Sequence, residues 1–191
     1  NSVEEEVARD FICFGNPHAT IVVTDATCLE RNLNLVLQVL EITDKVVVCV
    51  NLLDEAERKG ISVNLEVLSK LLGVPVVGTN ARDGQGLDEL KDAVYGVIKG
   101  DITTQPVKVD YSDPSLEKSL NLLEPVVRKV IQEKVNSKWL TIRLLEGDET
   151  ILDTLKKHMD LDLKANHLFT RKFHETLEVL NADGATHDDI R

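Results

Sequence analysis

The segment Asn51-Leu52-Leu53-Asp54 places an amide and a carboxylate directly after an apolar run, Val46–Val50. An aspartate carboxylate can accept two hydrogen bonds, from the N1–H and the 2-amino group of guanine, whereas adenine offers no such pair of donors. An asparagine amide nearby can help to position a base, and it can join neighbouring loops by hydrogen bonds. The motif is weak alone, because two common polar residues recur at this spacing by chance. Its position after the apolar run is what makes it informative.

The run Val46–Val50 is typical of a strand buried on both faces, as in the centre of a parallel sheet. Open sheets of this kind bind ligands at the carboxyl ends of their strands. Two other predicted strands also end in polar signatures, Asp25-Ala26-Thr27 and Thr79-Asn80-Ala81-Arg82. The turn after Arg82 is rich in glycine, so its backbone N–H groups can face a carbonyl such as the guanine O6, and the small Ala81 allows close approach. Loops from two consecutive strands therefore converge on one planar ligand.

Hydrophobic periodicity predicts the elements that position these loops. We expect strands at about 20–24, 45–50 and 74–78, and helices at about 3–14, 30–40, 64–72 and 87–99. Alternating strands and helices predict an α/β fold, a doubly wound and mostly parallel sheet, over residues 1–100. Residues 101–112 are typical of a linker. Four helices, at about 113–135, 138–145, 149–158 and 164–180, predict a small all-α domain over 101–191, with Pro125 kinking or breaking the first of them.

Composition narrows the function classes. The 191 residues carry a net charge of −11 with no basic stripe, which argues against nucleic acid as a partner. No apolar run is long enough to cross a bilayer and no signal peptide is evident, so we expect these residues to be soluble. The cysteines Cys13, Cys28 and Cys49 lack metal-ligand spacing, and the histidines complete no ligand set. We therefore predict no metal site within the chain.

Several stretches together resemble one family, ferrous iron transport protein B (FeoB), whose members carry a cytoplasmic GTPase domain. The resemblance extends over nearly the whole chain and is most specific at Asp25–Leu33. The other similar stretches are Ser2–Ile12, Asn51–Ala56, Thr79–Arg82, Trp139-Leu140 and Arg143–Asp148.

The resemblance implies roles for two sets of residues. The guanine-binding set is Asn51, Leu52, Asp54, Thr79, Asn80 and Ala81. The end of the second switch region is Ser2, Val3, Glu4 and Glu5. Leu52 stands where most small GTPases have a lysine, as an apolar residue does in this family, and Asn80 stands where a serine is common. No catalytic residue is assigned.

The motif Gly-x-x-x-x-Gly-Lys-Ser/Thr, which cradles phosphates, does not occur in these residues. The resemblance implies GTP or GDP as ligand, with magnesium and potassium bound by residues of the intact protein outside this chain. The chain alone is then expected to be an inactive part of a GTPase. Implied partners are a transmembrane iron-permeation domain, small accessory Feo proteins and further copies of the chain, at the cytoplasmic face of the inner membrane.

Other interpretations stay open at this point. Asp25 fits the N-cap of a helix better than a catalytic role. The whole chain could be a non-enzymatic interaction or scaffold module, since the phosphate-binding motif is missing. A different small GTPase is a third alternative, against which the acidic charge and Leu52 argue.

Overall fold

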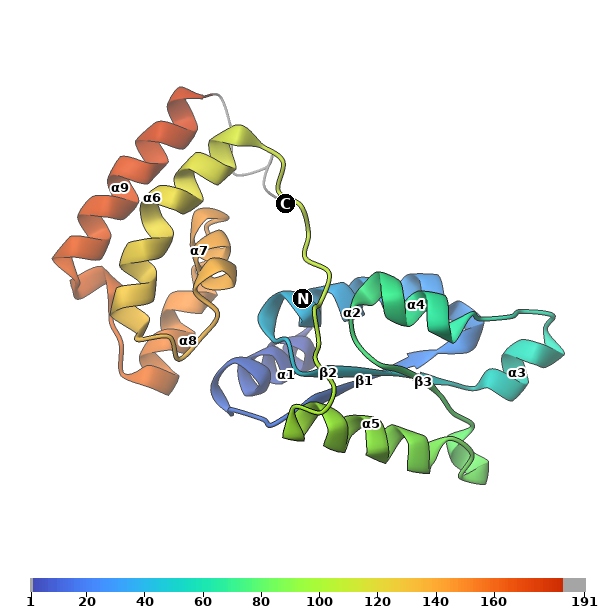
Figure 1. Cartoon of the computed structure of the whole chain (residues 1–191). Helices are drawn as coiled ribbons and strands as arrows, with labels where there is room; N and C mark the ends of the chain where they lie inside the picture. Colours follow the sequence, from blue (N-terminus) through green and yellow to red (C-terminus); the bar gives the residue numbers. More distant parts are fainter. Residues whose placement is uncertain (1, 184–191) are drawn as a thin grey trace. The chain divides into compact units, whose positions relative to one another are not determined.

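The computed structural model describes residues 2–183 and shows helices and strands in the order expected from the sequence (Figure 1). By its internal contacts the chain divides into two compact units, Asn1–Val109 and Asp110–Arg191. Among the helices of residues 2–183, none combines the length and the apolar character needed to cross a bilayer.

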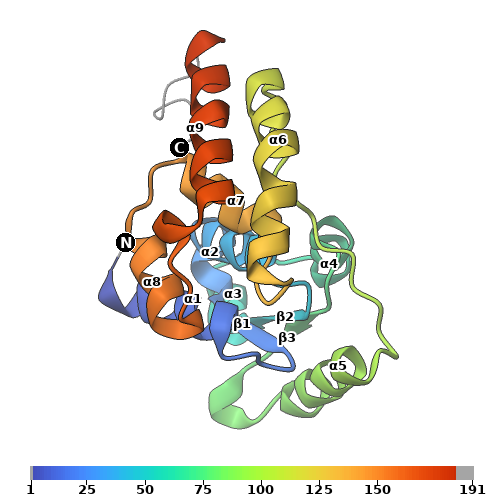
Figure 2. The same ribbon diagram turned by 90° about the vertical axis from the view of Figure 1, so that its left-hand side faces the viewer.

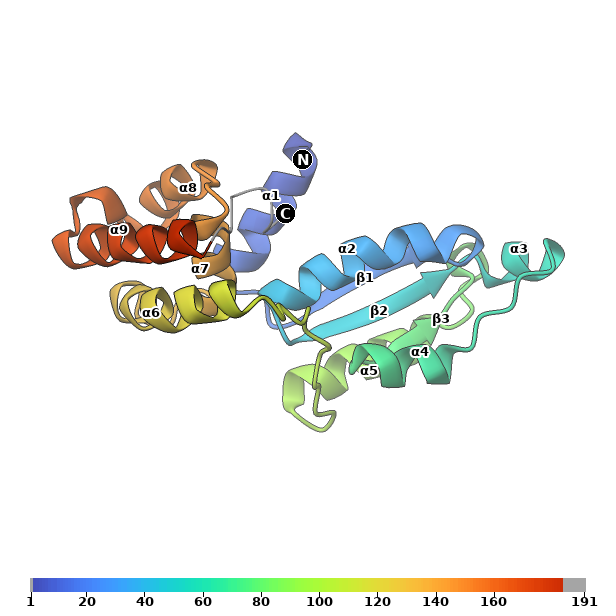
Figure 3. The same cartoon turned by 90° about the horizontal axis from the view of Figure 1, so that it is seen from above.

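The first unit is built on a parallel sheet in the order β1-β2-β3. The strands are β1 (Thr20–Asp25), β2 (Val46–Asn51) and β3 (Val76–Gly78). The central strand β2 is buried from Val46 to Val50, as its unbroken apolar run predicts. All three carboxyl ends lie at the edge of the sheet where α3 begins, so the loops that follow them are neighbours (Figure 3).

Helices cover both faces of this sheet. They are α1 (Val3–Phe14), α2 (Leu29–Ile42), α4 (Leu65–Leu72) and α5 (Leu87–Lys99). Val36 and Leu40 of α2 and Leu72 of α4 share one core with the Val48 side of the sheet. Ala93 and Val97 of α5 pack on Val47, which points to the opposite face. The predicted doubly wound α/β fold is confirmed.

Three short elements were not expected from the sequence: η1 (Ala26–Cys28), α3 (Leu53–Arg58) and η2 (Ala81–Asp83). Helix α3 lies where a loop was predicted. It has only six residues, so its sequence carries no readable helical period, and isolated helices of that length are unstable. All three elements directly follow a strand or its loop, so each one shapes the edge of the sheet where the polar signatures lie.

The predicted linker begins as an extended segment that packs on the first unit. The N–H groups of Gln105 and Val107 each donate to a carbonyl at the end of α4, Gly73 O and Leu72 O, at 2.9 Å. The ammonium group of Lys108 donates to Leu40 O and, at 3.0 Å, to Asp44 Oδ1. Residues 105–108 are therefore held by hydrogen bonds at the end of the sheet opposite to the polar loops.

The second unit is all-helical, as predicted (Figure 2). Its helices are α6 (Pro114–Ile131), α7 (Ser137–Leu145), α8 (Thr150–Met159) and α9 (His167–Ala182), with the short η3 (Leu163–Ala165) before the last. Helices α6 and α9 lie side by side, and Leu123, Val127 and Leu140 are fully buried. Of the kink or break expected at Pro125, the break is wrong, since α6 continues through that residue to Ile131.

Candidate functional site

Asn51 is the residue that joins two of the polar loops. It lies at the last position of β2, and its side-chain Oδ1 accepts hydrogen bonds from Thr79 Oγ1 at 2.9 Å and from the Ala81 N–H at 3.0 Å. Thr79 is fully buried, and its hydroxyl also lies 3.2 Å from Cys49 Sγ. A single amide oxygen thus fixes the loop after β3 to the end of β2.

Leu52 follows in a left-handed backbone conformation, with φ 63° and ψ 36°. Residues with a Cβ rarely adopt this conformation, which costs about 1–2 kcal/mol. The strained residue turns the chain from β2 directly into α3, and its side chain remains 40% exposed at the rim of the loop. An exposed apolar side chain there can cover one face of a planar ligand.

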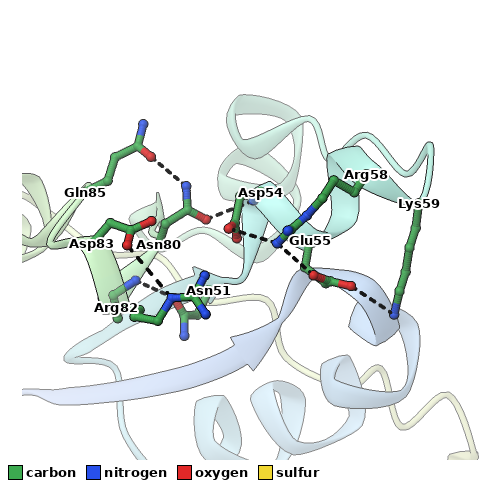
Figure 4. Close-up of polar contacts among 10 residues, drawn as sticks. Asn51, Asp54, Glu55, Arg58, Lys59, Asn80, Arg82, Asp83 and Gln85 are labelled. Carbon is green, nitrogen blue, oxygen red and sulfur yellow. Dashed lines mark hydrogen bonds and ion pairs between the residues drawn. The ribbon is translucent and has the colours of Figure 1, made fainter.

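Asp54 is held through its backbone by the loop after β3. Its N–H donates to Asn80 Oδ1 at 2.9 Å, and its carboxylate Oδ2 pairs with Arg58 Nη2 at 3.2 Å (Figure 4). Oδ1 has no partner among residues 2–183, and the side chain is 35% exposed. The carboxylate therefore keeps acceptor positions open toward solvent.

The side chain of Asn80, which stands where a serine is common, makes hydrogen bonds in two directions. While its Oδ1 accepts from Asp54, its Nδ2 donates to Gln85 Oε1 at 2.6 Å (Figure 4). The backbones of Asn80 and Gln85 also pair in both directions, at 3.0 and 3.2 Å. These bonds close residues 80–85 into a compact turn that carries Ala81 beside Asn51.

These loops enclose a small cavity of about 110 Å³. It is lined by Leu52, Asp54, Glu55, Arg58, Asn80, Ala81, Arg82 and Asp83. Pockets for drug-sized molecules usually span about 300–1,000 Å³, so this cavity suits a flat base rather than a whole nucleotide. Four of the six residues predicted to bind a base line it directly, and the other two, Asn51 and Thr79, hold its wall.

A larger hollow of about 890 Å³ lies elsewhere in the first unit, between the start of α2 and helix α4. None of the six predicted residues lines it. Exposed apolar side chains, Ile61, Val67 and Leu71, contribute to it, and its Asn64 side chain already caps α4 by accepting from the Val67 N–H. Its lining includes the carboxylate of Glu30, but no residue of the loops that directly follow β2 and β3.

Asp25 is engaged locally, as the helix-cap interpretation predicted. Its Oδ1 accepts from the Thr27 N–H at 2.8 Å and from Thr27 Oγ1 at 2.7 Å. The hydroxyl of Thr27, followed by its N–H, lowers the pKa of Asp25. Asp25 is the N-cap of η1 and does not line the base-sized cavity.

The predicted switch residues start helix α1. Ser2 is its N-cap: Ser2 Oγ accepts from the Glu5 N–H at 3.3 Å, and Glu5 Oε2 accepts from the Ser2 N–H at 3.1 Å. This reciprocal pair is a capping box. A backbone hydrogen bond, and then the Ser2 side chain, lower the pKa of Glu4. Neither these residues nor Val3 line the base-sized cavity.

Four residues that line the cavity were not among the predicted base-binding residues: Glu55, Arg58, Arg82 and Asp83. Gln85, which bonds to Asn80, was not predicted either. The spacing of Asp54 and Arg58, four apart, is that of an ion pair along a helix, and it would have been found had α3 been predicted. Gln85 has no such local signal, because its partner is fixed by the closure of the turn.

Two protein-family models match the chain. The model of ferrous iron transport protein B matches residues 1–94, and the model of the FeoB cytosolic helical domain matches residues 113–184. Together they cover most of both units.

Curated relatives carry the same family name. The chain is 34% identical over 144 residues to the Fe(2+) transport protein A/Fe(2+) transporter FeoB fusion protein of Porphyromonas gingivalis, which covers 70% of this chain and 16% of that protein. It is 33% identical over 148 residues to the Fe(2+) transporter FeoB of Salmonella typhimurium, covering 77% and 18%. The chain thus spans less than a fifth of the length of these relatives.

Solved structures agree with the fold over both units. The mGMPPNP-bound NFeoB from S. thermophilus has a TM-score of 0.76 at 26% identity and covers all of this chain and 68% of that chain. The cytosolic domain of the T. maritima FeoB iron transporter in a GDP form has a TM-score of 0.69 at 25% identity, covering 95% of this chain and 72% of that chain.

Proposed function

Because this chain belongs to the FeoB family of ferrous iron transport proteins, we propose that it supplies the base-binding side of a guanine-nucleotide site in a GTPase that serves iron uptake. In this proposal residues 1–100 are the later part of the GTPase domain and residues 101–191 are the linker with an attached helical domain, the linker belonging to the first compact unit up to Val109. The intact protein hydrolyses GTP and regulates Fe(II) entry at the cytoplasmic face of the inner membrane.

One observation carries the proposal: two loops from neighbouring strands are joined by side-chain hydrogen bonds around a cavity that fits a base. Asn51 connects to Thr79 and Ala81, and Asp54 connects to Asn80. An ionised carboxylate accepts only, so Asp54 selects a base with two adjacent donors, the N1–H and 2-amino group of guanine. Adenine would present an acceptor to it.

The remaining residues have complementary roles. Leu52 covers a face of the base, and the turn around Ala81 lies where the guanine O6 would approach. The Ala81 N–H donates to Asn51 Oδ1, so a base carbonyl would have to share that donor or replace Asn51. The polar and apolar groups present therefore fit a guanine base.

The phosphate side of the site is assigned to residues of the intact protein outside this chain. Those residues would hold the γ-phosphate, magnesium and potassium, and there water would attack the phosphorus. The proposed partners are the guanine nucleotide, the protein's own transmembrane iron-permeation domain, accessory Feo proteins and further copies of the chain.

A second function, a protein-interaction module, is favoured by one observation on α1. Its residues Val3, Val7 and Phe11 follow one face of the helix and are 74%, 63% and 64% exposed. Apolar side chains spaced in this way are typical of a helix that contacts another protein surface. The two functions are compatible, since base binding uses a different part of the first unit.

The test of the proposed function is Asp54→Ala in a full-length protein carrying this chain, with affinities for GTP and ATP measured by titration. Loss of hydrogen bonds to a charged group should reduce the preference for GTP over ATP about 10- to 100-fold, from about 1.5–3 kcal/mol. Asp83→Ala is the matched control, because Asp83 lines the same cavity while its carboxylate contacts only the neighbouring Arg82, at 3.8 Å, among residues 2–183. An unchanged preference in Asp54→Ala would refute the assignment.

A further inference from the structure

Helix α3 carries an arginine that contacts the proposed base-selecting carboxylate. Arg58 Nη2 lies 3.2 Å from Asp54 Oδ2 and 2.8 Å from Glu55 Oε2, so one guanidinium nitrogen is shared between two carboxylates (Figure 4). Arg58, Asp54 and Glu55 all line the base-sized cavity. The short helix thus places a cation at the edge of the site where only the carboxylate was expected.

We propose that Arg58 is a positioning residue for base selection: it orients the Asp54 carboxylate so that both donors of guanine are bound at once. This inference rests on the proposed function, since it concerns the same site. It adds a residue that recognises the base indirectly, through Asp54.

The orientation of the Asp54 carboxylate is not otherwise fixed. The Asp54 backbone is anchored by its hydrogen bond to Asn80, but this leaves the side chain free to rotate. Arg58 is the one group among residues 2–183 for which a contact with the carboxylate is observed, and that contact uses Oδ2 alone. A carboxylate has about four acceptor positions, so three remain when Arg58 occupies one, and guanine needs two.

The free energy of unfolding is an unsuitable measure of how Arg58 orients the Asp54 carboxylate. Arg58 is 63% exposed, and exposed ion pairs within a helix add little to folding. Restricting the rotation of Asp54 instead affects the two-point contact with guanine more than the one-point contact with hypoxanthine, which lacks the 2-amino group. The ratio of affinities for GDP and IDP isolates this effect.

Changing Glu55 should shift the ratio of affinities for GDP and IDP in the direction opposite to a change of Arg58. Glu55 competes with Asp54 for the same Arg58 nitrogen, at the shorter distance, and Lys59 lies 3.8 Å from its other oxygen. Removing the charge of Glu55 should leave Arg58 to Asp54 alone. Glu55→Gln should therefore raise the ratio that Arg58→Gln lowers, an opposition that a merely structural role for Arg58 would not produce.

The experiment measures GDP and IDP dissociation constants in the full-length protein for Arg58→Gln, Arg58→Lys and Glu55→Gln. Arg58→Gln should lower the preference for GDP about two- to fivefold, the range that an exposed ion pair allows, and Arg58→Lys should restore part of it. Lys70→Gln is the matched control: it breaks the exposed pair of Lys70 with Glu66 at 3.1 Å, also four residues apart, and should leave the ratio unchanged.

The outcomes separate this inference from the proposed function. If Asp54→Ala lowers the guanine preference and Arg58→Gln leaves the GDP-to-IDP ratio as it was, the role of Arg58 is refuted and the proposed site stands. If Asp54→Ala leaves the preference intact, or the unmodified protein has none, the proposed site and the role of Arg58 both fail.

Discussion

The loop after β1 and the loops after β2 and β3 look alike in sequence but are held in different ways. Asp25, after β1, bonds to Thr27 and Asn32, which lie two and seven positions along the chain. Asn51 and Asp54, after β2, bond to residues 26 to 30 positions away, in the loop after β3. The first loop is closed on itself, whereas the other two form one unit.

A polar residue at the end of a strand can therefore make two kinds of hydrogen bond, local or long-range. Local bonds satisfy the orphan N–H groups at the start of a helix, as Asp25 does for η1. Long-range bonds fix two loops at a set distance, which a rigid binding site requires. Perturbing each kind of contact should therefore have effects of different size.

The largest loss in the stability of the first unit is expected from Gly86→Ala, at the end of the loops joined after β2 and β3. Gly86 has φ +82°, and a Cβ there would lie 2.2 Å from Gly78 O. The left-handed backbone and the overlap with β3 together should cost about 2–5 kcal/mol. Hydrogen exchange of the β2 amides measures this, because it reports on the first unit separately from the second.

Gly84→Ala is the control for this prediction. Gly84 has a similar φ of +76°, but a Cβ there would meet nothing within 4 Å. Its substitution should cost only the backbone term, about 1–2 kcal/mol. Equal losses in the two variants would show that the turn does not rest closely on β3.

A smaller loss is expected from Asn51→Ala. It removes the acceptor for Thr79 Oγ1 and the Ala81 N–H, and Thr79 is fully buried. Leaving such donors without their partner should destabilise the first unit by about 2 kcal/mol. The same hydrogen-exchange experiment gives the value without any nucleotide.

Asn64→Ala is matched to it, since Asn64 accepts one local hydrogen bond, from the Val67 N–H at 3.1 Å. Loss of such a helix cap typically costs about 1 kcal/mol and should leave the loop after β3 undisturbed. If Asn51→Ala shifted only amides near residue 51, the two loops would not be joined as described.

The sequence was sufficient for the sheet and placed four of the predicted base-binding residues, Leu52, Asp54, Asn80 and Ala81, at one cavity. The apolar run of β2 and the polar residues after it have direct local signals, and both appear as predicted. Helix α3 is too short to show a period, so Arg58 was missed with it. The hydrogen bond between Asn80 and Asp54 depends on the register of β3 beside β2. The presence of asparagine where a serine is common does not reveal that contact.

The smallest effect, and the one with a distinctive pH dependence, is expected from Asp25→Asn. Because hydrogen bonds from Thr27 lower the pKa of Asp25 in the folded chain, its charge stabilises the fold above the unfolded value of about 3.9. That contribution is lost as the pH falls through the lower, folded pKa. An asparagine oxygen can still accept from Thr27, so the variant should lose only the part that depends on charge.

Wild type and Asp25→Asn should therefore differ slightly at pH 7 and converge in acid, when urea unfolding of the first unit is followed from pH 7 to pH 3. Asp101→Asn, at an exposed carboxylate for which no hydrogen bond or ion pair is observed in residues 2–183, should show no such convergence. If the free energies of unfolding of wild type and Asp25→Asn differed by the same amount from pH 7 down to pH 3, Asp25 would act through the shape of its side chain and not through its charge. The loop after β1 would then be held by geometry alone, as the joined loops are by the neutral amides of Asn51 and Asn80.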